Sequence, residues 1–342
     1  MELYLDSVDF KEIEEAFKLG TLAGLTTTPT FLHREGVTDI DATILKLAKM
    51  VPILQVEALG DNANEIVAEA KRQIKMGLDP KKTVFKIPVS MEGIKACKML
   101  TSEGLMVNVH LVYTLQQAYM AALAEATYIC VLVGRMQDQG HDALTLIAQC
   151  NEMINQHGFR SKVMFSSVRH MEHVRNAIEL GVHTITVPWS VMKKLTDNNF
   201  TSVGTKQFID HTKLITKKVS DIIRSDNPIV KTTDTVFDAS IIMTEAGFGA
   251  VSVVEEKTGK LVGVFTDGTI RRELKSSGRW ILDKKMSDFE FKSPFTISAD
   301  ALLEQAVAIF KKEHIDTIVV VKDGEVCGML DVQDLMKLDL LV

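Results

Sequence analysis

Eight short apolar runs, separated by longer amphipathic segments, occupy the first 225 or so residues and restrict the fold more than any other feature. The intervening segments have helical periodicity; in 62–76, for example, Ile66, Val67, Ala70 and Ile74 share one face. Eight strand–helix repeats in about 200 residues indicate a compact (β/α)8 barrel. The alternative, a doubly wound sheet, normally has a glycine-rich phosphate turn after its first strand, and this chain has none there. The runs are 3–5, 22–25, 53–57, 84–87, 106–111, 128–133, 163–166 and 184–187.

The pattern changes after residue 225. A long polar helix is expected over 205–224, and Ser225-Asp226-Asn227-Pro228 then marks a domain boundary. Beyond it, the segment 260–268 is echoed by 325–334, and each copy follows an apolar strand, at 250–254 and 317–321. This internal duplication predicts a barrel domain over 1–225 and a second domain over 226–342, with halves of about 227–290 and 291–342.

Composition limits the cellular compartments and the binding partners that we expect for this protein. The net charge of −6 argues against a nucleic-acid partner, and no apolar run is long enough to span a membrane. From the acidic, strand-like start we expect no signal peptide. The four cysteines are scattered and form no CxxC pair, so we expect free thiols and a cytoplasmic protein. His170 and His173 lie three residues apart on a predicted helix without a third ligand, so we expect a solvated face there and no metal.

Lys86 is a lone lysine in the apolar segment Thr83-Val84-Phe85-Lys86-Ile87-Pro88-Val89. A strand that is hydrophobic on both faces is typical of a buried parallel sheet. Burial favours the neutral form of an amine, and a neutral amine is a nucleophile toward carbonyl groups. The segment therefore favours Schiff-base chemistry, and the alternative is a strand-end lysine that reaches solvent.

The first 220 residues or so resemble the transaldolase family, and within it the short fructose-6-phosphate aldolase-like branch. Met1-Glu2-Leu3-Tyr4-Leu5-Asp6 matches the opening strand of that branch, and Thr26-Thr27-Thr28-Pro29-Thr30 resembles its TTNPS turn. Phe85-Lys86-Ile87-Pro88-Val89-Ser90-Met91-Glu92-Gly93 resembles its VKVPVTAEG strand. The resemblance implies that Lys86 forms the Schiff base and that Asp6 transfers the proton at the C–C cleavage step. The other interpretation of Asp6 is an N-cap for the following helix.

The same resemblance implies further site residues. Gln55 would hold the water that shuttles protons during imine formation, and Asn108 would touch substrate hydroxyls. Thr26 would belong to the substrate-binding turn. The phosphate would bind Arg135, Ser167 and Arg169, although surface ion pairs would also explain the two arginines.

Three positions depart from the pattern of the family. Thr28 replaces an Asn that bonds the Schiff base, and its hydroxyl could still bond one substrate oxygen. His110 replaces a Thr that positions the catalytic water; it could replace the water relay as a catalytic group or be a core histidine. Leu132 stands in the substrate site where the branch has a Tyr, so a tyrosine proton transfer is not available.

Residues 227–342 resemble a tandem pair of CBS domains, which form a cleft that often binds an adenine nucleotide or a sugar derivative. The segment Gly263-Val264-Phe265-Thr266-Asp267-Gly268 carries the resemblance in the first copy. The implied ligand-binding residues are Thr266, Asp267 and Asp334. Both copies are imperfect, because Thr269 and Asp331 stand where the family signature has an Asp and a hydroxyl residue.

These resemblances imply a class I enzyme with no separate cofactor beyond the covalent Schiff base on Lys86. It would cleave or transfer a dihydroxyacetone-type unit of a phosphorylated sugar, with the CBS pair serving regulation or assembly. The alternative is an altered or inactive barrel that supports a nucleotide- or sugar-nucleotide-sensing CBS pair. A third, weaker option is a non-aldol isomerase or lyase with His110 as base. We expect a homo-oligomer formed through the last helix of the barrel and the CBS pair.

Overall fold

The computed structural model describes residues 1–224, 226–338 and 340. It divides into two compact units, residues 1–197 and the residues from 198 onward. The helix that follows residue 198 groups with the second unit, whereas the boundary predicted at residue 225 would place it with the barrel. The limits of the independently folding domains stay a prediction. In the described part of the chain, no helix combines the length and the apolar character needed to cross a membrane.

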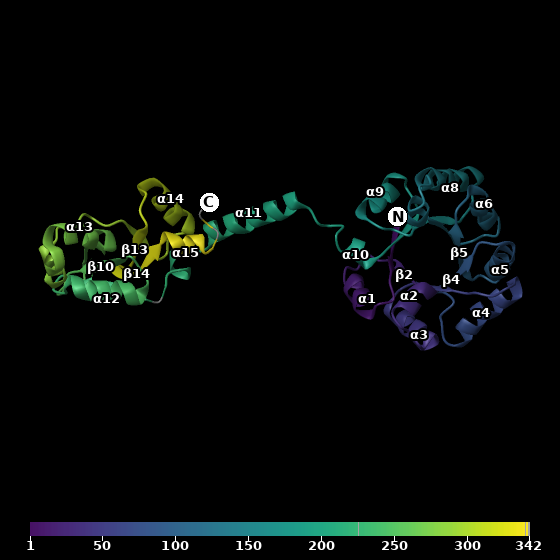
Figure 1. Ribbon diagram of the computed structural model, residues 1–342, viewed down its shortest axis with the longest axis horizontal. Helices are drawn as coiled ribbons and strands as arrows, with labels where there is room; N and C mark the ends of the chain where they lie inside the picture. The colour runs from purple at the N-terminus through teal and green to yellow at the C-terminus, as the bar shows by residue number, and fades with distance from the viewer. Residues whose placement is uncertain (225, 339, 341–342) are drawn as a thin grey trace. The chain divides into compact units, whose positions relative to one another are not determined.

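The first unit is a closed parallel barrel of eight strands, seen end-on as a ring in Figure 1. The first strand pairs with the second and with the eighth, which closes the ring. Each strand overlaps a predicted range, so the predicted (β/α)8 barrel is confirmed. The strands are β1 (Glu2–Asp6), β2 (Gly24–Thr26), β3 (Leu54–Glu57), β4 (Thr83–Pro88), β5 (Met106–Val112), β6 (Tyr128–Leu132), β7 (Lys162–Ser166) and β8 (Thr184–Val187).

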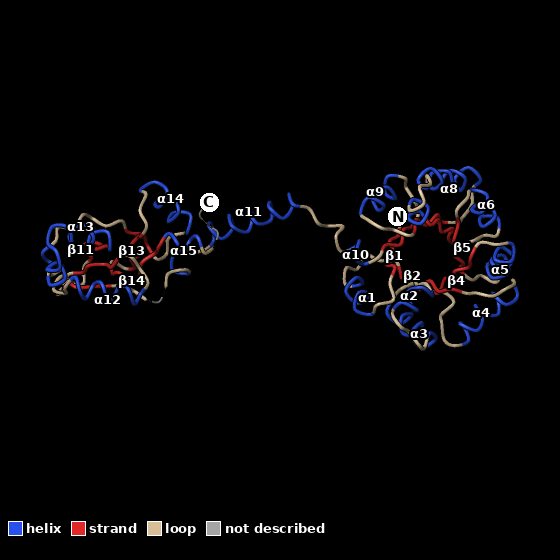
Figure 2. Tube along the Cα trace, viewed as in Figure 1, coloured by secondary structure: helices blue, strands red, loops and turns tan. Residues whose placement is uncertain are grey.

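Helices surround the strands on the outside of the ring (Figure 2). Most begin where a short polar side chain accepts a hydrogen bond from a main-chain N–H of the first turn, as Asp9, Asn62 and Ser90 do. The helices are α1 (Phe10–Phe17), α2 (Pro29–Arg34), α3 (Ile40–Met50), α4 (Ala63–Lys75), α5 (Met91–Ser102), α6 (Leu115–Leu123), α7 (Val133–Gln137), α8 (Ala143–His157), α9 (Met171–Glu179) and α10 (Trp189–Met192).

Two layers of apolar side chains stabilise this unit. The larger lies between the strands and the helices and includes Leu5, Phe85 and Ile129. The smaller fills the inside of the ring and consists of Tyr4, Val84, Tyr128, Cys130, Leu132 and Met164. The Tyr4 and Tyr128 hydroxyls are 2.9 Å apart within it. Most of this inner cluster packs the ring below the strand ends, so polar side chains that point inward gather at the carboxyl ends of the strands.

The second unit contains the predicted repeat. Its two sheets have the strand orders β11-β10-β9 and β12-β13-β14, and in each the central strand pairs parallel with one neighbour and antiparallel with the other. The elements of the first half are β9 (Ile229–Lys231), α12 (Val236–Ala246), β10 (Ala250–Val254), β11 (Leu261–Thr266) and α13 (Asp267–Ser277). Those of the second half are β12 (Thr296–Ser298), α14 (Leu303–Glu313), β13 (Thr317–Lys322), β14 (Glu325–Asp331) and α15 (Val332–Met336). Three short 3-10 helices, η1 (Val219–Asp221), η2 (Gly278–Asp283) and η3 (Met286–Asp288), complete the described elements.

The helix predicted over 205–224 is α11, which runs from Asn199 to Thr216, so both predicted limits are wrong. It begins early because the Asn198 side chain caps its first turn. It ends early because Val219 leaves the helix to donate its N–H to the carbonyl of Ala301 at 2.8 Å. The predicted break that follows falls partly on residue 225, which lies outside the described residues.

Candidate functional site

Lys86 lies inside the carboxyl end of the barrel. It is on β4 and only 5% exposed, so the interpretation in which its amine reaches solvent is wrong. Its Nζ donates a hydrogen bond to the main-chain carbonyl of Thr27 at 2.7 Å. The same Nζ lies 3.0 Å from Oε1 of Glu57, which is its register neighbour on β3. The amine is thus dry and held between an amide carbonyl and a carboxylate.

Glu57 lies between the amine and an imidazole. His110 Nε2 is 2.9 Å from Glu57 Oε2, but neither atom completes a well-directed hydrogen bond, so the contact is electrostatic. Burial acts to raise the pKa of the Glu57 carboxyl, but Lys86 and His110 outweigh it and hold this pKa below its usual range. Burial lowers the pKa of His110, which favours the neutral imidazole.

The backbone at His110 is irregular. The pairing of β5 with β6 shifts register between Val109 and Val112, and Leu111 has φ of +58°. A bulky residue in this region is strained, and such strain collects at sites where a side chain must be aimed. The bulge sets the direction in which His110 leaves the strand.

Asp6 ends β1 at the same mouth. Its Oδ1 accepts a hydrogen bond from Thr26 Oγ1 at 2.8 Å, and Thr26 also contacts the Thr186 hydroxyl. Burial raises the pKa of Asp6, while the Lys86 charge and the Thr26 hydroxyl partly offset it. Asp9 caps α1, so the alternative interpretation of Asp6 as that N-cap is wrong. Thr26 is 2% exposed and contacts Asp6, and its place in the substrate-binding turn stays a prediction.

Gln55 and Asn108 form a polar layer beneath the amine. Both are completely buried, and Asn108 Nδ2 donates to Gln55 Oε1 at 2.6 Å. The register neighbour of Gln55 on β4 is Val84, which lies two residues before Lys86. Gln55 Nε2 and Asn108 Oδ1 have no hydrogen-bond partner among the described residues. These two atoms are a donor and an acceptor that a polyhydroxylated ligand could use.

The predicted phosphate-binding residues follow β6 and β7. Arg135, on α7, is exposed and donates from Nη1 to the Tyr113 hydroxyl at 3.0 Å. Ser167 has φ of +61° directly after β7. Arg169 Nη2 lies 3.1 Å from Asp138 Oδ2 in an exposed ion pair, as its alternative interpretation predicted.

His173 supports this loop. Its Nδ1 accepts the main-chain N–H of Arg169 at 3.2 Å, and its Nε2 lies 2.6 Å from Gln137 Oε1. The side chain is 2% exposed, so the predicted solvated face is wrong for His173, whereas His170 is exposed as predicted. Burial lowers the pKa of His173 to about 4, which keeps it neutral. No cluster of three or more His, Cys, Asp or Glu side chains in the described residues could hold a metal ion.

The remaining predicted barrel residues sit at the ends of secondary structure. Thr28 is the N-cap of α2, where its Oγ1 accepts the N–H of Phe31 at 3.3 Å. The hydroxyl hydrogen is still free for a ligand. Leu132 is the last residue of β6, buried among the apolar side chains inside the ring. It therefore offers an apolar wall at this position.

Glu57 is the site residue that the sequence interpretation missed. It lies two residues after Gln55 on β3, so strand alternation places both on the inner face, with Glu57 nearer the mouth. That alternation was visible in Leu54-Gln55-Val56-Glu57 and could have identified it.

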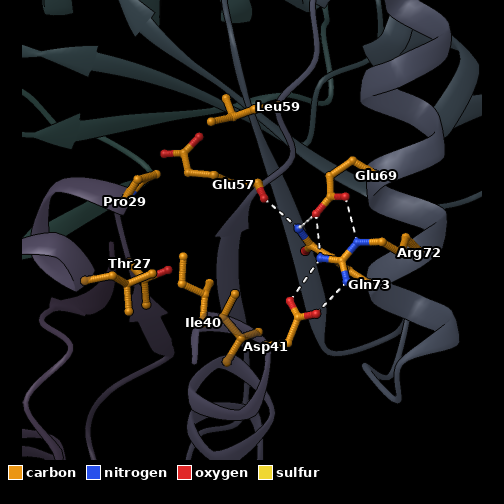
Figure 3. A pocket seen from close by; sticks show the side chains of 11 residues that line it. Thr27, Pro29, Ile40, Asp41, Glu57, Leu59, Glu69, Arg72 and Gln73 are labelled. Atoms are coloured by element: carbon orange, nitrogen blue, oxygen red, sulfur yellow. Dashed lines mark hydrogen bonds and ion pairs between the residues drawn. The ribbon is translucent and has the colours of Figure 1, made fainter. Parts of the chain in front are cut away.

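A cavity of about 260 Å³ adjoins Glu57 on the side of α2, α3 and α4. Figure 3 shows the Glu57 main-chain carbonyl bonded to Gln73, while its carboxylate points away from Arg72. Arg72 bonds Asp41 and Glu69 on the far wall. The guanidinium is neutralised by two carboxylates, so this wall does not offer a free charge.

The predicted ligand residues of the second unit lie at helix starts. Thr266 caps α13, accepting the N–H of Thr269 at 3.2 Å, and Asp267 is exposed. Asp334 is 7% exposed and its Oδ1 lies 2.9 Å from Arg224 Nη2. Arg224 also stacks over the Phe248 ring at 4.1 Å. Asp334 is therefore already paired inside its own unit.

Known proteins match the barrel and the second unit separately. The model of the Transaldolase/Fructose-6-phosphate aldolase family matches residues 3–236, and CBS domain matches cover 219–276 and 286–340. A "Probable transaldolase 2" of Bacillus anthracis is 34% identical over 212 residues, which are 61% of this chain and 96% of the relative. A "Probable transaldolase" of Shouchella clausii is 35% identical over 210 residues, 61% of this chain and 95% of the relative.

Solved structures similar to this chain contain CBS domains. One is the CBS domain of a membrane protein from Sphaerobacter thermophilus, with 19% identity and a TM-score of 0.36 over 42% of this chain and 99% of that one. Another is a CBS-domain-containing protein from Agrobacterium tumefaciens, with 19% identity and a TM-score of 0.32 over 35% of this chain and 88% of that one.

Proposed function

This chain belongs to the transaldolase/fructose-6-phosphate aldolase family and carries a CBS domain pair, and we propose that it is a class I Schiff-base enzyme. It cleaves or transfers a dihydroxyacetone-type unit of a phosphorylated sugar. The observation that carries the proposal is the buried amine of Lys86 at the carboxyl end of the barrel, 5% exposed and within reach of a carboxylate. An apolar side chain at this position would stabilise the fold more than a buried amine does, so the lysine is not explained by stability.

The residues at the mouth can be assigned to steps. The Lys86 amine attacks the ketose carbonyl and forms an imine, which withdraws electrons from the adjacent C–C bond. Asp6 accepts the proton of the substrate hydroxyl as that bond breaks. The unpartnered atoms of Gln55 and Asn108 bond substrate hydroxyls, and Arg135 binds the phosphate.

Borohydride trapping tests the proposal. Fructose 6-phosphate or dihydroxyacetone is incubated with the protein and borohydride, and intact mass followed by peptide mapping locates the adduct. We expect one adduct per chain on Lys86 and none in Lys86→Met. Trapping on exposed Lys18 in both proteins would reveal non-specific reaction, and no adduct on Lys86 with either carbonyl compound would contradict the proposal.

A second candidate is a barrel without turnover that supports a ligand-sensing CBS pair. The changes at Thr28, His110 and Leu132 favour it, because they alter the surroundings of the amine. Calorimetry with AMP, ATP and sugar nucleotides separates the candidates: tight binding that survives Lys86→Ala, without turnover of any sugar phosphate, would favour the sensor. If instead His110 is the base of an isomerase or lyase, His110→Ala costs more activity than Lys86→Ala.

We also propose that the enzyme is a cytoplasmic homo-oligomer that assembles through α11 and the CBS pair. Helix α11 has no buried residue, and Phe200, Val203, Phe208 and Ile215 lie along one side of it, all largely exposed. The four cysteines are unpaired, as expected in a reducing compartment. Light scattering of the Phe200→Ser/Phe208→Ser variant should show smaller particles than wild type.

A further inference from the structure

The Lys86 amine cannot attack a carbonyl while it carries its full set of protons, so a neighbouring group must accept one. Two acceptors contact Nζ in the described part of the chain: the Thr27 carbonyl oxygen at 2.7 Å and Glu57 Oε1 at 3.0 Å. An amide carbonyl accepts a hydrogen bond but is too weak a base to take the proton. Glu57 is therefore the proton acceptor in contact with the nucleophile.

Glu57 is held in place from three directions. Its main-chain carbonyl accepts from Gln73 Nε2 at 2.8 Å, and the same Nε2 donates to Glu69 Oε1 at 2.8 Å. Its main chain pairs in register with Lys86. His110 approaches the second carboxylate oxygen at 2.9 Å, which leaves the first one facing the amine. A carboxylate fixed in this way meets the geometric requirement for proton transfer.

We propose that Glu57, rather than Gln55, carries the protons of imine formation at Lys86, with His110 as its positioning residue. The inference rests on the proposed Schiff-base function and names the group that makes it possible. Nothing in the predicted site included Glu57, and Gln55 bonds Asn108 in the layer below.

The proton balance closes on Glu57 alone. The carboxylate takes one proton from the ammonium, and the free amine forms the N–C bond while the carbonyl π pair moves to oxygen. The protonated Glu57 gives its proton to that oxygen, then takes a second proton from nitrogen. As the C–O bond breaks, this proton leaves with the hydroxyl as water, and the nitrogen lone pair forms the C=N bond. The ammonium and the ketone thus become a protonated imine and water, and the Glu57 carboxylate is again paired with a cation.

The alternative role for Glu57 is a fixed counter-ion that holds the ammonium charged. The two roles predict opposite effects of Glu57→Gln on trapping. If Glu57 transfers protons, the amide cannot do so, and dehydration of the carbinolamine slows. If Glu57 only holds the charge, removing it frees the amine and speeds trapping. Other charged or titratable groups also act on these three residues. Asp6 and Cys130 interact electrostatically with Lys86, and Arg135 interacts with His110. Arg169 acts on the neighbouring Asp6.

The test follows borohydride trapping of dihydroxyacetone over time at neutral pH in wild type and Glu57→Gln. We expect Glu57→Gln to trap about 100-fold more slowly than wild type. In Glu57→Ala, added formate should restore part of the rate, which a purely structural role would not allow. Glu57→Asp keeps the carboxylate but moves it away from the amine. Its trapping rate should lie between those of wild type and Glu57→Gln. His110→Phe should slow trapping less than Glu57→Gln and should not respond to formate.

Acylation of Lys86 by acetic anhydride is the second readout, with exposed Lys18 as internal reference. It should be faster in Glu57→Gln than in wild type, which shows that the variant is folded and its amine intact. Wild-type or faster trapping by Glu57→Gln overturns this inference alone. Absence of any wild-type adduct overturns the proposed function and this inference with it. If Glu57→Gln does not fold, the other two variants decide. The inference about Glu57 is overturned if Glu57→Asp traps as fast as wild type, or if formate does not raise the trapping rate of Glu57→Ala.

Discussion

Gly134 lies so close to the main-chain carbonyl of Ser167 that a Cβ built on the glycine would be 1.7 Å from that oxygen. The start of α7 and the turn after β7 therefore pack backbone against backbone, next to Arg135, which is assigned to the phosphate. Ser167 itself has φ of +61°, an unfavourable conformation for a residue with a side chain.

Gly134→Ala should disrupt this contact. We expect a loss of about 1–3 kcal/mol in the free energy of unfolding, since the new methyl group overpacks the turn. The KM for a phosphorylated ketose should rise, because the displaced turn carries Ser167, whereas borohydride trapping of dihydroxyacetone, which has no phosphate, should change less. Urea denaturation and steady-state kinetics measure both effects. Gly204→Ala is the control, because a Cβ there meets no atom within 4 Å. It should neither lower the free energy of unfolding nor raise the KM for a phosphorylated ketose.

Thr26→Val should move the acidic limb of the pH–rate profile to higher pH. The Thr26 hydroxyl stabilises the Asp6 carboxylate, so its loss raises the pKa of Asp6 further. The proposed role of Asp6 requires the carboxylate, and activity is lost as pH falls through this pKa. The profile of kcat/KM against pH measures the shift. Thr184→Val removes a buried barrel hydroxyl that donates to Val163 and should leave the limb in place; an unchanged limb in Thr26→Val would contradict the assignment.

Removing one member of the buried Lys86–Glu57 pair should lower the free energy of unfolding more than removing both members. Lys86→Met leaves the Glu57 carboxylate buried without its cation and should lower the free energy of unfolding by about 3–5 kcal/mol. The double variant Lys86→Met/Glu57→Gln should recover most of this loss. Urea denaturation followed by circular dichroism measures both.

The exposed pair of Lys71 and Glu103 is the control for this cycle. Lys71→Met should change stability by only about 0–1 kcal/mol, because solvent screens that pair. Losses that simply add in the Lys86/Glu57 double variant would show that the two residues are not coupled.

Arg135→Gln should weaken binding of the phosphate and leave chemistry intact. A charge-assisted hydrogen bond contributes about 1.5–3 kcal/mol, so the KM for a phosphorylated ketose should rise roughly 10- to 100-fold. The rate of borohydride trapping of dihydroxyacetone on Lys86, which involves no phosphate, should stay the same. Arg175→Gln, an exposed arginine that pairs with Glu172 on α9, should have no effect. Equal losses for both compounds would place Arg135 outside the phosphate site.

The barrel could be predicted from the sequence because its strands are buried on both faces and leave uninterrupted apolar runs. Helix α11 was misplaced because its start depends on one capping side chain, Asn198, and its end on a tertiary bond to Ala301. Lys86 was singled out as a lone lysine in an apolar strand, and Asp6 was assigned through a family motif. Glu57 was missed because it matched no motif, although its alternation with Gln55 on β3 places it on the inner face. Its contacts with Lys86 and His110 depend on strand register and on the bulge beside His110, which the local pattern does not report.

Arg224→Gln should increase the affinity of the second unit for AMP or ATP. In wild type, the Asp334 carboxylate, which the CBS resemblance assigns to ligand binding, is paired with Arg224 at 2.9 Å, and the guanidinium also donates to the carbonyl of Gly247. A ribose must displace this cation, so neutralising it removes the competition and should lower Kd in calorimetry. Asp334→Asn in the same background should reverse the gain. Lys231→Gln removes an exposed cation that faces Glu256 and should not change Kd, whereas weaker binding in Arg224→Gln would show that the guanidinium itself contacts the nucleotide.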